Sequence, residues 1–234
     1  MDALVEMNDF AAFLMECREY KRALEIWNYC LTHVPQNQHS SIDTEIMKKH
    51  KDVMKSCSAN HHRRPVNNGS ANKVFVYRNP LRLTESELSR SHVDPEVAMS
   101  SNFIFNIALC HHLIALDTFV QQPPRSDTDL LRHKHCIKRL RGALKLYELG
   151  FHLHSKKGLE GMSMNYALAL INNCANIYET LGSTGKAQRF YHHMLSSLMM
   201  MIDGGEAEKV DELEGYLRNA SRLILGGKNV AAAA

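Results

Sequence analysis

The sequence lacks the features that mark secreted, disulfide-built and membrane-spanning proteins. Its 234 residues include six cysteines that lie far apart, with no CxxC pair among them. Cysteines placed singly inside helical patterns are expected to be buried, reduced thiols. No run of about 18 apolar residues occurs. The amino terminus, MDALVEMNDF, carries acidic residues where a secretory or organellar signal would be basic. We therefore expect a soluble intracellular protein, cytoplasmic or nuclear.

The sequence also lacks the motifs of common enzymes and metalloproteins. It contains no glycine-rich phosphate loop, no GxSxG sequence, and no serine or cysteine tied by spacing to a base. Histidine is abundant, at 14 residues, but many of the histidines form adjacent or alternate pairs. Such pairs point apart on a helix, and neither HExxH nor zinc-finger spacing is present. We expect no enzyme activity, no metal site and no cofactor.

A spacing of small and aromatic residues recurs three times along the chain. Ala175 is followed after twelve residues by Ala187, and then after four by Tyr191. The first 35 residues repeat these intervals, and a third copy keeps the second interval but lengthens the first from 12 to 35 residues. Small residues facing an aromatic ring allow two antiparallel helices to pack closely. The residues expected to pack in this way are Ala11, Ala23, Trp27, Ala108, Ala143, Tyr147, Ala175, Tyr178, Ala187 and Tyr191.

These three hairpins resemble tetratricopeptide (TPR) repeats, in which the same spacing recurs over about 34 residues. The first copy is the most similar, because it keeps Trp27, Pro35 and the entry into the second helix at Arg18 to Ala23. More closely, FNIALCHHLIAL, ALKLYELG, ALINNCANIYETLG and the helix through Leu217-Arg218-Asn219 are similar to a group of uncharacterised diatom proteins with divergent repeats. The resemblance implies an all-α fold of antiparallel helical hairpins, stacked as a right-handed TPR-like solenoid. It implies no catalytic activity.

The pattern divides this one continuous solenoid into four stretches. Residues 1–57 hold the first hairpin and a following helix from Ser41 to Cys57, and residues 58–93 form an irregular loop or short strand excursion. Residues 94–227 hold a long hairpin, a TPR-like hairpin and a last helix, and residues 228–234 form a loose tail. Within the excursion, Val74, Val76, Leu81 and Leu83 are expected to dock on the helices, because a free two-stranded hairpin is marginal in water. The later helices are expected at Asp94 to Phe119, Thr128 to Leu153, Ser163 to Leu181, Thr184 to Ile202 and Glu206 to Leu225, the last stopped by Gly226-Gly227.

Asparagine stands two residues before the small packing residue in two repeats, as Asn106 before Ala108 and Asn173 before Ala175. Asparagine disfavours a helix interior by roughly 0.6 kcal/mol relative to alanine, so these positions need a reason. In peptide-binding TPR proteins, asparagines on the first helix of each pair line a concave groove and bind peptide backbone. The resemblance thus implies a partner-binding groove formed by Asn106, Asn173, Asn176, Phe105, Glu179 and Asn219, with Asn8 or Asp9 as the counterpart in the first repeat. The alternative is that the asparagines bond internally to a neighbouring helix or loop.

Two stretches are rich in cations, residues 48–90 and 132–157, although the net charge of the chain is only +3. Such asymmetry suits an acidic protein or a nucleic acid, or it is a solvated surface. The expected function is a protein–protein interaction scaffold that binds an extended peptide or partner segment in a concave helical groove. The alternative is a nucleic-acid-binding helical repeat that uses the two basic faces.

Overall fold

The computed structural model describes residues 2–33, 74–82, 95–118, 126–155 and 163–231. All regular secondary structure within these ranges is helical, which confirms the predicted all-α class. The elements are α1 (Asp2–Glu16), α2 (Tyr20–His33), α5 (Pro95–Thr118), α6 (Asp127–Ser155), α7 (Met164–Thr180), α8 (Thr184–Asp203), the 3-10 turn η1 (Ala207–Lys209) and α9 (Leu213–Ala231). Residues 74–82 form no strand pair but run without regular secondary structure. The expected helix at 41–57, the rest of the excursion, and the tail at 232–234 lie outside the described residues.

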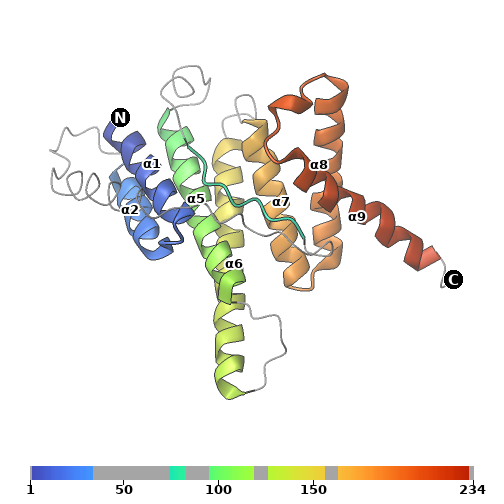
Figure 1. Cartoon of the computed structure of the whole chain (residues 1–234), viewed down its shortest axis with the longest axis horizontal. Helices are drawn as coiled ribbons and strands as arrows, with labels where there is room; N and C mark the ends of the chain where they lie inside the picture. The colour runs from blue at the N-terminus through green and yellow to red at the C-terminus, as the bar shows by residue number, and fades with distance from the viewer. Residues whose placement is uncertain (1, 34–73, 83–94, 119–125, 156–162, 232–234) are drawn as a thin grey trace.

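Consecutive helices pack against each other in pairs, and the pairs follow one another in a row. The pairs are α1 with α2, α5 with α6, and α7 with α8; α2 also packs on α5, α6 on α7, and α8 on α9. Figure 1 shows this succession from the amino-terminal to the carboxy-terminal end. The hairpin of α5 and α6 has the longest helices, and the amino-terminal part of α6 projects beyond the neighbouring pairs (Figure 1).

The α1–α2 hairpin and the α7–α8 hairpin are closed by turns of the same backbone geometry. Gly182 has a positive φ of 77°, and the Ser183 N–H bonds the Tyr178 carbonyl at 2.8 Å. This closes the end of α7 in a Schellman turn. Arg18 takes the same place after α1, with φ of 63°, so a side chain occupies a backbone conformation that favours glycine.

The small and aromatic residues of the repeat pattern lie in the hydrophobic core or pack against it. Nine of the ten are 4% exposed or less, the alanines together with Trp27, Tyr147 and Tyr191. Tyr178 is only half-buried and packs its ring on Phe190, with ring centroids 5.5 Å apart. Burial of large rings against alanines leaves little void and makes the pair sensitive to added volume.

The predicted bounds of the last helix are wrong at both ends. The chain after α8 makes the short turn η1, Val210 is buried, and α9 begins only at Leu213. α9 then continues through Gly226-Gly227 to Ala231. A glycine costs a helix only about 1 kcal/mol relative to alanine, so two glycines do not stop a helix unless the chain needs a turn there.

The apolar helix α5 lies in the middle of the fold. Among the described helices it alone is long and apolar enough to cross a membrane by length and composition, and 72% of that stretch is buried inside the protein. Polar side chains are buried along it, namely Asn102, Asn106 and His112. The described cysteines are free thiols, and burial raises the pKa of Cys110, on α5, to about 12.

Candidate functional site: asparagines that hold an extended segment

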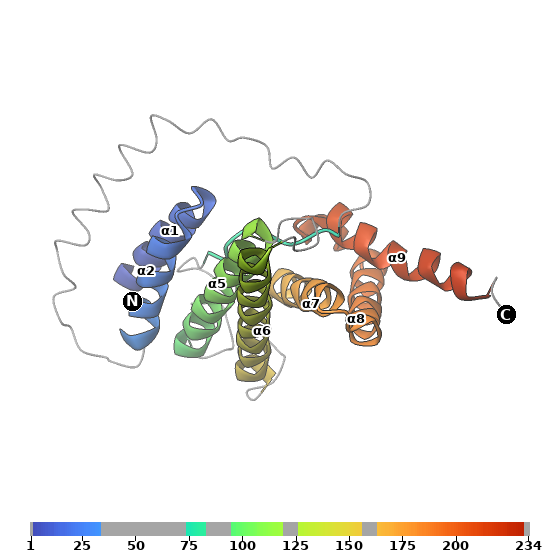
Figure 2. The ribbon, with the colours of Figure 1, turned by 90° about the horizontal axis from the view of Figure 1, so that it is seen from below.

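Residues 74–82, here named the strap, cross the row of helices in an extended conformation. The strap comes early in the sequence, yet it lies across α5 and α7 and reaches α9 (Figure 1). Seen from below, it follows one side of the row, from α9 toward α1 (Figure 2). The first helix of each pair therefore contacts a segment of its own chain at the place where the sequence predicts a partner.

Asparagine side chains hold the strap by its backbone. Asn219 on α9 accepts a hydrogen bond from the Phe75 N–H at 2.9 Å and donates one to the Phe75 carbonyl at 2.7 Å. Asn173 on α7 repeats the pattern with Tyr77, at 3.0 and 3.1 Å. One side-chain amide thus satisfies both polar backbone groups of one strap residue, as a neighbouring β-strand would.

The third such pair of hydrogen bonds lies at the other end of the strap. Asn106 on α5 accepts from the Leu81 N–H at 2.8 Å and donates to the Leu81 carbonyl at 2.9 Å. Asn8 on α1 donates to the same carbonyl at 3.2 Å, and its own oxygen accepts the Trp27 indole N–H at 2.9 Å. We refer to Asn106, Asn173 and Asn219 together as the asparagine ladder.

The spacing along the strap explains how one face of helices reaches three residues. Phe75, Tyr77 and Leu81 are separated by even numbers of residues. Alternate residues of an extended chain present their N–H and C=O groups to the same edge. Because Arg78 is an odd number of residues from each of them, its N–H is expected at the opposite edge. The ladder therefore recognises an extended backbone and places no demand on side-chain identity through these bonds.

Further buried asparagines connect the ladder residues. Asn172 accepts from the Asn219 amide at 2.6 Å and donates to the Phe75 carbonyl at 3.2 Å. Asn102 accepts from Asn106 at 3.1 Å, and the Asn173 amide also reaches the Tyr147 hydroxyl at 3.1 Å. All of these asparagines are 5% exposed or less. A buried amide without partners is costly, and this network supplies partners to each of them.

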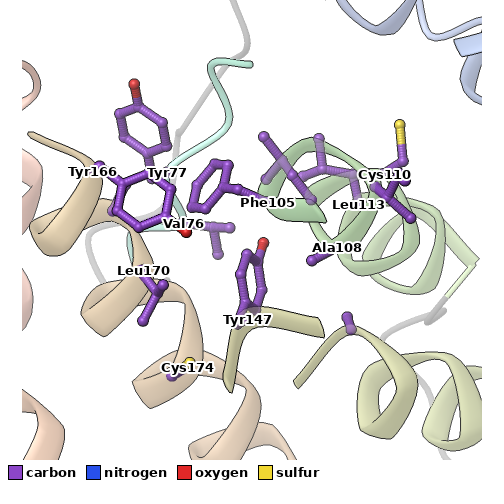
Figure 3. Close-up of a cluster of buried hydrophobic side chains, with 14 of the residues drawn as sticks. Val76, Tyr77, Phe105, Ala108, Cys110, Leu113, Tyr147, Tyr166, Leu170 and Cys174 are labelled. Carbon is purple, nitrogen blue, oxygen red and sulfur yellow. The ribbon is translucent and has the colours of Figure 1, made fainter. Parts of the chain in front are cut away.

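Aromatic side chains anchor one half of the strap. Tyr77 stacks on Tyr216 of α9 with centroids 6.2 Å apart and meets Phe105 edge-on at 6.3 Å. Phe75 meets the edge of Tyr216 at 5.4 Å. Figure 3 shows Val76 and Tyr77 beside Phe105, where the strap meets α5, α6 and α7.

Gly215 on α9 makes room for the Phe75 ring. A Cβ at this position would lie 2.5 Å from the ring, closer than any real contact. Any other residue at 215 would displace either the ring or the helix, so the glycine is explained by the strap.

The carboxy-terminal end of the strap is held from the surface. Arg82 bonds Glu16 at 2.8 Å and lies 3.5 Å from Asp9, all three side chains being more than 40% exposed. Exposed ion pairs contribute about 0 to 1 kcal/mol, so the ladder and the aromatic anchors dominate the attachment.

The structure divides the predicted groove residues into two groups. Asn106, Asn173 and Asn219 contact the strap backbone, and Phe105 contacts the Tyr77 ring. The other two, Asn176 and Glu179, are not part of these contacts, which corrects the predicted set.

Asn176 and Glu179 instead join elements of the helical row. Asn176 is buried and accepts a hydrogen bond from His112 Nε2 at 2.9 Å, as the internal-bond alternative expects. Glu179 accepts from the Tyr191 hydroxyl at 2.9 Å and pairs with Arg222 at 3.0 Å. Both residues are displaced along α7 from Asn173, toward the other end of the helix, and face neighbouring helices.

His112 is a fully buried histidine with a shifted pKa. Burial lowers its pKa to about 4; the bond to Asn176 opposes this shift, and the nearby Arg78 guanidinium adds to it. The ring is therefore neutral at physiological pH, with the proton on Nε2, because Asn176 offers an oxygen. Its Nδ1 is buried without a hydrogen-bond partner among the described residues.

Sequence reasoning missed residues that have no repeat signal of their own, including Asn172, Gly215 and Tyr216. The available signals were the consecutive pair Asn172-Asn173 and the run VFVY at 74–77, which is typical of an extended segment whose backbone needs partners.

Among the described residues, no three His, Cys, Asp or Glu side chains are grouped to hold a metal ion. No protein-family model, curated protein or solved structure matches this chain.

Proposed function

We propose that this protein is a protein-interaction scaffold, a divergent right-handed TPR-like solenoid related to the diatom proteins named above, and not an enzyme. Its concave asparagine-lined groove binds an extended polypeptide segment by the backbone, and the strap is the resident occupant of that groove. The proposed location is cytoplasmic or nuclear. One observation carries the proposal: each ladder asparagine both donates to and accepts from a single residue of an extended segment.

The free energies of these contacts indicate which features a segment needs in order to bind in the groove. The six ladder bonds contribute about 0.5 to 1.5 kcal/mol each, or roughly 3 to 9 kcal/mol together. Fixing the backbone of the strap residues opposes this by about 1 to 2 kcal/mol per residue. The ladder alone is therefore insufficient, and burial of Phe75, Val76 and Tyr77, at about 1.5 to 3 kcal/mol each, supplies the remainder. The groove thus selects an extended segment with an aromatic-apolar-aromatic run.

The strap has an advantage over any free segment of equal quality. Because it is tethered, its effective concentration at the groove is on the order of millimolar. A partner segment in solution must bind more tightly than the strap, or bind when the strap is absent.

The test uses a variant in which 74–82 is replaced by a glycine-serine linker of equal length, with the synthetic 74–82 peptide as the probe in fluorescence anisotropy. Methylation of the Tyr77 nitrogen removes a donor to Asn173, and should weaken binding by about tenfold. Methylation of the Arg78 nitrogen, on the opposite edge, is the matched control and should change affinity little.

Equal losses from the two methylated peptides would contradict backbone recognition by the ladder. If the linker variant does not fold, the double variant Phe75→Ala, Tyr77→Ala takes its place, because it keeps the length of the chain and removes only the anchors.

The alternative function, nucleic-acid binding, rests on the basic stretches. Most of residues 48–90 lie outside the described part of the chain, and Arg82 is engaged with Glu16 and Asp9. The exposed cations of α6 are the observation that favours it. Nucleic-acid affinity falls steeply with salt through counterion release, whereas binding of a peptide backbone responds weakly.

A further inference from the structure

The outer face of α6 carries a straight stripe of four cations. Lys134, Lys138, Arg141 and Lys145 are spaced four, three and four residues apart, which places them on one side of a helix, and all four are exposed. The stripe is about 17 Å long at the helical rise of about 1.5 Å per residue. No acidic residue occurs in α6 between Asp129 and Glu148.

These cations have no partners within the described part of the chain. Neighbouring cations differ: Arg132 pairs with Asp129 at 3.6 Å, and Arg139 lies 3.2 Å from His111. Like charges four residues apart on a helix destabilise it. The stripe contains two such pairs, so α6 carries a repulsion that no described contact offsets.

The same face is partly apolar. Ile137 and Gly142 lie beside the four cations, and His133 lies at the end of this open surface. A Cβ at Gly142 would meet no atom within 4 Å, so no internal contact requires the glycine. Leu130 lies one heptad before Ile137 on the same side and is 46% exposed. Glycine is less favourable than alanine in a helix interior, and here it leaves room for another backbone to come close.

The four cations of the stripe are exposed within the described part of the chain. The amino-terminal part of α6 also projects beyond the end of α7 (Figure 1). The strap site lies elsewhere, on the side formed by α1, α5, α7 and α9, so a partner on the stripe leaves the ladder undisturbed.

We propose that this stripe docks an acidic helical segment of a partner protein. A partner helix has the same rise per residue, so acidic residues at the same four-three-four spacing meet each cation in turn. Its apolar residues at heptad spacing meet Leu130 and Ile137. A nucleic acid fits less well, because none of the four stripe residues is aromatic and able to stack a base, and the chain as a whole carries only +3.

The experiment uses the full chain and two synthetic helical peptides of identical composition. One peptide has four glutamates and two leucines at the matching spacing, and the other has them scrambled around the helix. A single-stranded oligothymidylate is the third probe. Binding is measured by fluorescence anisotropy at physiological salt, and we expect the matched peptide to bind at least about tenfold more tightly than either other probe.

Substitutions in the stripe test whether the matched peptide binds there. The double change Lys138→Glu, Arg141→Glu should weaken the matched peptide by at least about tenfold, because two attractions become repulsions. The control, Lys21→Glu with Arg22→Glu, alters the net charge equally on the exposed side of α2 and should leave affinity within about twofold. If the charge-reversed variant does not fold, Lys138→Gln with Arg141→Gln is used with the same expectation of direction.

Equal binding of the scrambled peptide would overturn the proposal in favour of unspecific charge attraction. Tighter binding of the oligonucleotide, with a steep salt dependence, would overturn it in favour of a nucleic-acid surface. Absence of binding by the matched peptide, or equal loss in the α2 control, would also overturn it. The strap experiment is independent of each of these outcomes.

Discussion

Replacing Asn173 by alanine removes the central rung of the ladder. The side chain is fully buried, and its loss leaves the N–H and C=O of Tyr77 without their partners, in a residue that is 3% exposed. Each unsatisfied buried group costs about 1 to 3 kcal/mol, so the free energy of unfolding should fall by roughly 2 to 6 kcal/mol for the two groups. For a chain of this size that corresponds to a melting temperature lower by roughly 4 to 24 °C.

The assay is denaturant unfolding followed by circular dichroism, with calorimetry for the melting temperature. Asn165→Ala is the matched control, because Asn165 is also on α7 and bonds the Asp211 N–H and the Lys209 carbonyl, but in an exposed position. Its loss should cost about 1 kcal/mol or less, since water replaces the bonds. If Asn173→Ala destabilises the protein no more than Asn165→Ala does, the ladder does not hold the strap.

Three further changes test the packing and the titration around the strap. Gly215→Ala should destabilise the protein by forcing the Phe75 ring away, and a double-mutant cycle with Phe75→Ala should show that the two losses do not add, because the smaller side chain removes the clash. Ala187→Leu should overpack the α7–α8 pair and cost about 1 to 3 kcal/mol in a denaturant titration; an unchanged midpoint contradicts the repeat alignment. His112 has a folded-state pKa near 4, below its usual 6.5, so its contribution to stability is present above about pH 6.5 and is lost as the pH falls toward 4. The urea midpoint of the native protein should therefore fall more between pH 7 and pH 4.5 than that of His112→Gln, and equal falls would show that His112 does not titrate in this way.

The helices could be predicted because their signals are local. Small residues at helical spacing, the glycine of the α7–α8 turn and the proline that opens α5 are each read within a few residues, and the described helices other than α9 begin and end close to the expected positions. α9 was misplaced because its start depends on the turn η1 and on the burial of Val210. Neither of these follows from periodicity.

The site could be predicted only in part, because it joins distant parts of the chain. The asparagines were recognisable as residues that a helix interior does not favour, but their occupant lies 144 residues away in the case of Asn219 and Phe75. Docking of Val74 and Val76 is expected from their apolar character, whereas the contact of Phe75 with Gly215 joins residues far apart in the chain and has no local signal. Asn176 lies one turn from Asn173 on the same helix face, yet it bonds His112 and not the strap. Position on that face alone therefore does not predict that an asparagine belongs to the ladder.

Amide hydrogen exchange measured residue by residue with NMR tests the central claim most directly, because the ladder bonds the N–H groups of three strap residues, Phe75, Tyr77 and Leu81. The account predicts slow exchange at the N–H groups of Phe75, Tyr77 and Leu81 and fast exchange at Arg78, whose N–H is on the opposite edge. In Asn173→Ala, the protection of Tyr77 should be lost first. Uniform exchange along residues 74–82, whether fast or slow, would contradict recognition of the strap by the asparagine ladder.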